Sequence, residues 1–206
     1  MACGFGFNRQ DRWRPKVREL VEMGEKGTQV VYLTATLPAR EEAEFFGAMG
    51  LKREDVGIFR DVTSRANIRY RVVEFEREEE EAVVEEFVEG LQKKYPAPGQ
   101  IVIYVKSIEQ AKRLGEVLGC STYFRELGTE EHKREILQRL TKGKEQVFVA
   151  SNAMGLGIDA AHIRAVVHIG VREKIRDYAQ ESGRAGGDRK KSEAIILRAC
   201  WKGRNG

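Results

Sequence analysis

From residue 67 onward, short apolar runs alternate with amphipathic stretches. Strands are predicted where a few apolar residues run together, and helices where apolar residues recur every three or four positions. The predicted strands cover residues 68–75, 101–105, 146–150, 165–169 and 193–197, and the predicted helices cover residues 77–94, 108–118, 130–140 and 174–182. Short strands that alternate with helices are typical of an α/β fold with a mostly parallel sheet flanked by helices.

The part of the chain before residue 67 has a less regular pattern. Its predicted elements are a helix around residues 15–23, a buried strand at 29–35, a helix at 41–49 that ends at Gly50, and a polar linker at 60–66. One full strand is too little to build an independent hydrophobic core. The sequence therefore predicts one complete domain preceded by part of another.

Charge is spread unevenly along the chain, although the formal net charge is only +4. Residues 74–89 contain nine glutamates, whereas residues 184–204 contain seven lysines or arginines against Asp188 and Glu193. A basic run of this kind can meet phosphate, but it is also typical of an ordinary solvated surface. The charge pattern by itself leaves both interpretations open.

The three cysteines, Cys3, Cys120 and Cys200, lie far apart in the sequence. Their odd number and wide spacing argue against a disulfide framework, and no CxxC pair indicates a zinc site, so no metal ligand is predicted. No run reaches the roughly 18 apolar residues that a membrane span requires, and no signal-peptide pattern begins the chain. We expect an intracellular protein that does not enter a membrane, in the nucleus if its source is eukaryotic.

Two predicted strands end in polar residues that suit a nucleic-acid phosphate. Lys106 and Ser107 follow the strand at 101–105, and Ser151 and Asn152 follow the strand at 146–150. In a parallel sheet both pairs emerge at the same edge, where a following helix offers free N–H groups and a partial positive charge. A helix capped by Ser107 beside a solvated lysine accounts for the first pair equally well.

Two glycine-rich segments suit a bound nucleotide. Gly155 and Gly157 let the backbone approach a ligand closely, and Asp159 can accept a hydrogen bond from a ribose hydroxyl. The predicted helix at 174–182 delivers Gln180 and then Arg184 among glycines, where an arginine can face the charge of a polyphosphate. A lone GxG is a weak signal, because glycines are common in turns.

A further polar pair, Thr34 and Thr36, stands at the end of the strand predicted at 29–35, just before Pro38. Small hydroxyl side chains at that position can relay a change at a phosphate to a neighbouring lobe. Ordinary turn chemistry also explains threonines before a proline.

Taken in order, these segments resemble a known family. The runs TATLP, IVIYVKS, VASNAMGLGID and QESGRAGGD closely resemble motifs III to VI of superfamily 2 helicases, and QESGRAG with the preceding VVHIG is most similar to the RecQ branch. The run RANIR at residues 65–69 resembles the inter-lobe linker of that family. WRPKVREL at residues 13–20 is similar to the segment after its acidic metal-site motif. The resemblance extends from about residue 11 to residue 198.

The resemblance implies a RecA-like, P-loop NTPase-type lobe at residues 71–200, a linker at 61–70 and a remnant of the first lobe at 1–60. It implies a fragment of an ATP-dependent DNA helicase, in which two lobes bind ATP and Mg²⁺ between them and move along single-stranded DNA in the 3′ to 5′ direction. The roles it implies are catalytic for Gln180 and Arg184, cofactor-binding for Gly157, Asp159, Gly183 and Asp188, DNA-binding for Lys106, Ser107, Ser151 and Asn152, and coupling for Thr34 and Thr36.

The sequence departs from the family in several places. It contains no GxxxxGK[ST] loop and no DExH-type motif, so the ATP phosphates and Mg²⁺ have no holder in this chain. Gly187 stands where the family has a second arginine, and whether Arg189 replaces that arginine stays open. The usual segment after motif IV is replaced by residues 123–128, and the zinc and winged-helix modules of the family are absent.

Two functions are therefore predicted, of different classes. In the first, the chain is a piece of the helicase that works with DNA and with a missing first lobe, and is inactive by itself. The alternative is a non-catalytic nucleic-acid or partner-binding module from a degenerate helicase copy.

Overall fold

The computed structural model describes residues 29–34, 37–60, 65–151 and 161–200. The chain divides into two compact units, residues 1–63 and residues 64–206, and each unit is described by itself. The helix predicted at residues 15–23 lies outside the described residues.

The described part of the first unit contains three short helical elements. It contains the 3₁₀ turn η2 (Ala39–Glu41), the helix α2 (Glu42–Ala48) and the 3₁₀ turn η3 (Arg53–Asp55). The helix predicted at residues 41–49 is confirmed. Gly50 follows α2 with a φ of 62°, a left-handed conformation that glycine adopts without steric cost.

The prediction of a buried strand at residues 29–35 is wrong. Residues 29–34 carry no strand assignment, and the side chains of Val31 and Leu33 are 71% and 91% exposed. An extended segment becomes a strand by pairing with another, and the described residues of this unit supply no strand for it to pair with.

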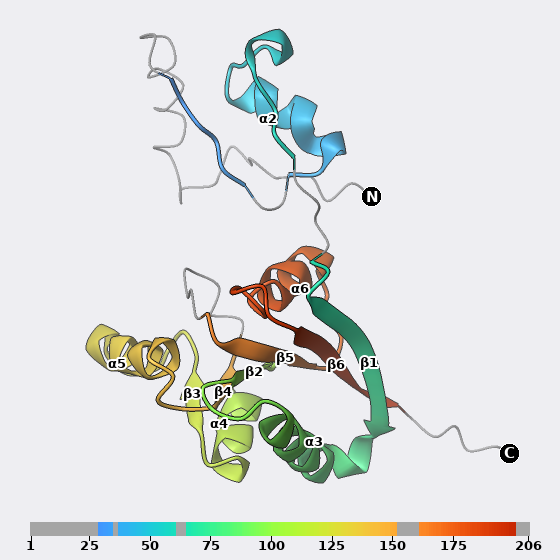
Figure 1. Ribbon diagram of the computed structural model, residues 1–206, viewed down its shortest axis with the longest axis vertical. Coiled ribbons are helices and arrows are strands. Elements are labelled where there is room, and N and C mark those ends of the chain that lie inside the picture. Colours follow the sequence, from blue (N-terminus) through green and yellow to red (C-terminus); the bar gives the residue numbers. More distant parts are fainter. Residues whose placement is uncertain (1–28, 35–36, 61–64, 152–160, 201–206) are drawn as a thin grey trace, which may run out of the picture. The chain divides into compact units, whose positions relative to one another are not determined.

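The second unit is built on a parallel sheet (Figure 1). Within its described residues, six strands form one sheet in the order β1-β6-β5-β2-β4-β3, and every pairing is parallel. The strands are β1 (Ile68–Glu76), β2 (Gln100–Tyr104), β3 (Ser121–Tyr123), β4 (Val147–Ala150), β5 (Ile163–Ile169) and β6 (Ser192–Cys200). The predicted α/β fold with a parallel sheet is confirmed.

Helices connect these strands and cover both faces of the sheet. They are the 3₁₀ turn η4 (Arg77–Glu79) and the helices α3 (Glu80–Lys94), α4 (Ile108–Val117), α5 (Glu130–Thr141) and α6 (Ile175–Ser182). Each of the four helices predicted for this unit is confirmed to within a few residues. In Figure 1, α3 and α4 lie on one side of the sheet, and α5 and α6 lie on the other.

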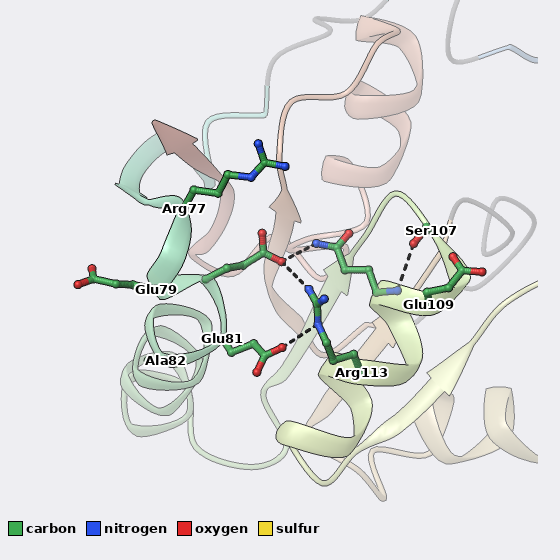
Figure 2. A pocket seen from close by; sticks show the side chains of 9 residues that line it. Arg77, Glu79, Glu81, Ala82, Ser107, Glu109 and Arg113 are labelled. Atoms are coloured by element: carbon green, nitrogen blue, oxygen red, sulfur yellow. Dashed lines mark hydrogen bonds and ion pairs between the residues drawn. The ribbon is translucent and has the colours of Figure 1, made fainter. Parts of the chain in front are cut away.

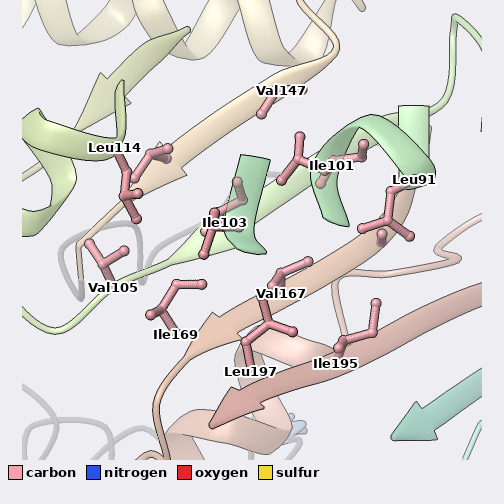
Figure 3. Packing of buried hydrophobic residues seen from close by; sticks show 14 of the residues in the cluster. Leu91, Ile101, Ile103, Val105, Leu114, Val147, Val167, Ile169, Ile195 and Leu197 are labelled. Atoms are coloured by element: carbon pink, nitrogen blue, oxygen red, sulfur yellow. The ribbon is translucent and has the colours of Figure 1, made fainter. Parts of the chain in front are cut away.

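Two hydrophobic clusters hold these layers together. On one face, α3 and α4 pack through Val84, Leu91 and Leu114 against alternate residues of the strands, among them Ile103 and Val167 (Figure 3). The remaining residues of the strands point to the other face, where they meet Ile136, Leu140 and Ala185. Because both faces are covered, β2, β4 and β5 are buried along their whole length. That is why the sequence shows them as unbroken apolar runs.

The strand β3 was not predicted. It has three half-buried residues, too few to show a period, and among the described strands it pairs only with β4, at the edge of the sheet. It packs against α4 where Gly115 meets Thr122.

Candidate functional site

The first group of predicted site residues gathers at the carboxyl ends of β2 and β4. These strands are neighbours in register, with Tyr104 opposite Ala150, and the Val105 N–H donates to the Ala150 carbonyl at 2.9 Å. Lys106, Ser107 and Ser151 therefore leave the sheet at the same edge, as predicted. Asn152 lies outside the described residues.

Ser107 caps the helix α4. Its hydroxyl accepts a hydrogen bond from the Gln110 N–H at 3.1 Å, and the Gln110 side-chain oxygen accepts one from the Lys106 N–H at 3.3 Å. Gln110 is held in turn, because its amide group donates to Glu80 at 2.8 Å (Figure 2). The N–H groups of Lys106 and Gln110 are thus already used within the protein.

Lys106 is exposed, and its side chain lies against Gly170, the residue after β5. A Cβ atom at Gly170 would stand 3.1 Å from the Lys106 Cε, and Gly170 has a φ of 80°. Glycine at this position therefore leaves room for the lysine to lie along the edge of the sheet. Sequence reasoning missed Gly170, although a glycine directly after an apolar strand marks such a place.

Carboxylates surround this edge. Glu79, Glu80, Glu81 and Glu109 line a hollow of about 690 Å³ beside Ser107 (Figure 2). The pKa of Glu109 is lowered by its own backbone N–H and by the Ser107 hydroxyl. This carboxylate already interacts with the start of α4, so a phosphate must compete with it. The acidic run at residues 74–89 was noted in the sequence, but its position beside Ser107 was not foreseen.

Arginine residues offset part of that negative charge. Arg113 pairs with Glu80 at 3.2 Å and with Glu81 at 2.8 Å. Arg77 lines the same hollow, and Figure 2 shows these side chains arriving from α3, α4 and η4.

The second group of predicted residues belongs to α6 and the turn after it. Gln180 is exposed on α6, and Gly183 caps the helix, with its N–H donating to the Ala179 carbonyl at 2.9 Å. Arg184 follows, half-buried, near the hydroxyl of Tyr104. Burial raises the pKa of Tyr104 to about 12, and the positive charge of Arg184 opposes that rise. The arginine side chain therefore lies against the last residue of β2, the strand that leads to Lys106.

A buried polar network lies between α6 and the sheet. Glu181 accepts a hydrogen bond from the Arg172 Nη2 at 3.3 Å, forms an ion pair with the Arg172 Nε at 3.0 Å, and contacts the Nε2 of His168 at 2.9 Å. His168 stacks on Tyr104 with 5.4 Å between the ring centres, and Arg172 also donates to the Val105 carbonyl at 3.4 Å. The network ties the helix that delivers Arg184 to the end of β2. Sequence reasoning missed it, and the one available signal was a histidine inside an apolar strand.

Asp188, which was predicted to bind the cofactor, is paired with Arg164 in this structure. It receives two hydrogen bonds from Arg164, which is 8% exposed, at 2.9 Å and 2.5 Å. The hydrogen bond from Arg164 holds the pKa of Asp188 below its ordinary value. This geometry supports a role for Asp188 in shaping the turn. Gly187 and Arg189 flank it and are exposed, and Arg189 has a φ of 64°.

Four further predicted site residues fall outside this description of the second unit. Thr34 belongs to the first unit, which is described by itself. Thr36, Gly157 and Asp159 lie outside the described residues.

The described residues contain no group of three or more His, Cys, Asp or Glu side chains that could hold a metal ion. Arg184 suits the negative charge of a polyphosphate, but no phosphate-binding loop accompanies it. Across the part of the chain that the structure describes, no helix has the length and apolar character that crossing a membrane requires.

Comparison with known proteins identifies the family. The model of the helicase conserved C-terminal domain matches residues 81–188. The chain is 33% identical to the ATP-dependent DNA helicase RecQ of Pasteurella multocida over 82% of its length, and 27% identical to the RecQ-like DNA helicase BLM of Xenopus laevis over 90%. It spans only 26% and 14% of those two proteins.

Solved structures agree on the fold. The chain resembles the E. coli DEAD-box protein SrmB with a TM-score of 0.56 and 20% identity, over 66% of this chain and 79% of that one. It resembles domain 2 of the DEAD-box helicase Mss116p with the same TM-score and 15% identity, over 65% of this chain and 54% of that one. The chain belongs to the helicase conserved C-terminal domain family and contains the C-terminal RecA-like lobe of a RecQ-type superfamily 2 helicase.

Proposed function

We propose that this chain is the part of an ATP-dependent, 3′ to 5′ DNA helicase that supplies its second motor lobe. Lys106, Ser107 and Ser151 contact the backbone of single-stranded DNA, while Gln180 and Arg184 face a nucleotide held by a first lobe. The observation that carries this proposal is the meeting of Lys106–Ser107 and Ser151 at one edge of the paired strands β2 and β4.

The contacts at this edge support weak binding that does not depend on base sequence. The ammonium of Lys106 is exposed and can reach phosphate, whereas the Ser107 hydroxyl caps α4 and Ser151 is 7% exposed, so a phosphate contact by either hydroxyl requires a local rearrangement. Glu109 interacts with the start of α4 and repels phosphate. We expect two or three neutralised phosphates and poor affinity at physiological salt.

The contacts of Arg184 support its assignment to the nucleotide. Its side chain lies beside Tyr104, on a segment that Glu181 and Arg172 fix to the end of β2. An arginine with limited freedom is suited to a charge that develops at a fixed place. Because the sequence has neither a GxxxxGK[ST] loop nor a DExH-type motif, we expect no ATP turnover by this chain in isolation.

Domain boundaries and the remaining roles belong to the same proposal. The division at residues 63 and 64 supports a remnant of the first lobe at 1–60, a linker within 61–70 and the second lobe at 71–200, although residues 68–70 already form the start of β1. Coupling by Thr34 and Thr36, and nucleotide contacts by Gly157, Asp159 and Gly183, stay predictions.

The DNA site is tested by measuring the fluorescence anisotropy of labelled single-stranded DNA with the full chain at several salt concentrations. The slope of log K against log salt is about −0.7 per phosphate on single strands, so two or three contacts give about −1.4 to −2.1. Lys106→Ala should make that slope shallower by about 0.7 and weaken binding equally for different sequences. Lys142→Ala is the matched control, because it removes the same charge just after α5, before β4 begins.

Equal affinity and slope for the Lys106→Ala protein and the unaltered chain would reject the DNA site. If deletion of residues 201–206, the end of the basic run noted at residues 184–204, then abolished binding, the contact would belong to that run instead.

The alternative of a non-catalytic binding module is favoured by the engagement of Asp188 with Arg164 and by Gly187, which stands in place of an arginine. Titration of ATP with and without single-stranded DNA separates the two functions. Binding of DNA without any binding of ATP, even after a first lobe is added in trans, would favour the module.

A further inference from the structure

The turn after Arg184 is held by a residue from the start of the unit. The side-chain amide of Asn67 donates to the carbonyl of Gly186 at 2.9 Å and to the carbonyl of Lys190 at 3.0 Å. The backbone carbonyl of Asn67 accepts a hydrogen bond from the Ser192 N–H at 2.9 Å. One side chain thus joins both ends of the turn at residues 186–190.

Gly186 is shaped to fit this contact. It has a φ of 61°, and a Cβ atom there would stand only 2.3 Å from the Asn67 Nδ2. Glycine is required both by the backbone conformation and by the close approach of the amide. The turn and Asn67 therefore form a fitted pair, which excludes a side chain at residue 186.

Other contacts fix the turn to the sheet. The Gly186 N–H donates to the Ile163 carbonyl at 2.9 Å, and Asp188 is held by Arg164. Arg184 precedes Gly186 by two residues, and its own N–H donates to the Glu181 carbonyl at 3.1 Å. Between the end of α6 and this fixed turn, the backbone of Arg184 has little room to move.

We propose that Asn67 is a positioning residue for Arg184. Its side chain connects the first residues of the second unit, which begins at residue 64, to the turn at residues 186–190. This turn sets the direction of the Arg184 side chain. A change in the course of the chain where it enters β1 is then transmitted to Arg184 through two hydrogen bonds. The effect of this change on function rests on the proposed role of Arg184 toward a nucleotide. The positioning of Arg184 by Asn67 does not depend on that role.

The test follows the Arg184 side chain directly. In NMR spectra of the full chain, the Nε–Hε signal of Arg184 reports its place beside the ring of Tyr104. Asn67→Asp keeps the size of the side chain and removes both donors, so the Arg184 signal should move toward the position of a free arginine. Amide hydrogen exchange at residues 186–190 should rise about tenfold or more, because two hydrogen bonds are lost. The Arg172 signal, held by Glu181, should stay in place.

Gln92→Glu is the matched control. Gln92 is a part-buried amide that donates to the Gln146 side chain at 3.3 Å, away from the turn, so its replacement should leave the Arg184 signal unchanged. Asn67→Ala serves as the second variant. In that background Gly186→Ala should cost less stability than it does in the unaltered chain, because the clash with the amide is gone.

A folded Asn67→Asp or Asn67→Ala protein with an unmoved Arg184 signal would overturn the proposal. Loss of folding in both variants while Gln92→Glu folds would also overturn it, since Asn67 would then determine folding and not position. A moved Arg184 signal in a chain that binds no DNA or nucleotide would support the positioning role of Asn67 and would reject the proposed function.

Discussion

Single residues decide how the segment after α6 is built, and Arg189 is the clearest case. It has a φ of 64°, the only positive value at a non-glycine among the described residues. Its side chain is exposed, and the strain is held by the hydrogen bond from its N–H to the Gly186 carbonyl. A left-handed conformation at a residue with a Cβ is unfavourable by about 1–2 kcal/mol.

Arg189→Gly should therefore stabilise the protein by about 1 kcal/mol, less the entropy that glycine loses on folding. Urea unfolding of the two proteins measures the difference. Lys191→Gly, an exposed neighbour without a positive φ, is the control and should lower stability instead. A less stable Arg189→Gly protein would mean that the arginine side chain holds the turn through contacts of its own.

At the scale of elements, the packing of α4 on β3 depends on a glycine inside a helix. Gly115 lies in α4 and is buried, and a Cβ atom there would stand 2.2 Å from the Cγ2 of Thr122. Gly90 in α3 has nothing within 4 Å of the same position. The two glycines have the same helix propensity but differ in surroundings.

Gly90→Ala should stabilise the protein by about 1 kcal/mol, the difference in helix propensity between the two residues. Gly115→Ala should instead destabilise it by about 1–2 kcal/mol, because the clash with Thr122 outweighs that gain. The double variant Gly115→Ala, Thr122→Ser removes the colliding methyl group and should recover most of the loss in thermal unfolding. Equal gains from both alanine substitutions would show that β3 moves away without cost.

At the scale of the whole lobe, one buried carboxylate joins three elements. Glu193 in β6 is 2% exposed and meets Arg71 of β1 at 3.1 Å, Lys94 of α3, and the hydroxyl of Tyr95 at 2.8 Å. Burial raises the pKa of Glu193, but the hydrogen bonds from Lys94 and Tyr95 and the charge of Arg71 outweigh it and hold the pKa below its ordinary value of 4.5. The same contact and burial raise the pKa of Tyr95 to about 12.

The lowered pKa makes stability depend on pH in a defined direction. The ionised Glu193 contributes fully to the free energy of unfolding at pH values above its ordinary pKa of 4.5. This contribution is lost as the pH falls from about 4.5 through the lowered pKa, because the carboxylate becomes protonated. Glu193→Gln should lower stability by about 1–2 kcal/mol at pH 7 and should flatten the acid side of the pH profile of unfolding. Glu74→Gln breaks an exposed pair with Arg198 and should change neither. An unaltered acid limb in the Glu193→Gln protein would assign acid sensitivity to other carboxyl groups.

The sequence by itself determined the kind of fold and the order of its elements, with the exception of the short edge strand β3. Unbroken apolar runs such as residues 101–105 mark strands buried on both faces, and local signals such as Ser107 with Gln110 mark helix starts. These features depend on neighbours in the chain, so they are visible without a structure. They also allowed the correct inference that Lys106 and Ser151 share one edge.

Tertiary structure decided what lies around those residues. The strand expected at residues 29–35 failed because strand formation needs a partner, which sequence period does not supply. Asp188 meets Arg164, and Asn67 meets Gly186 and Lys190, which lie 119 and 123 positions away in the sequence. Such pairings bring together groups that are distant in the chain, and only the packing of the sheet determines which of them meet.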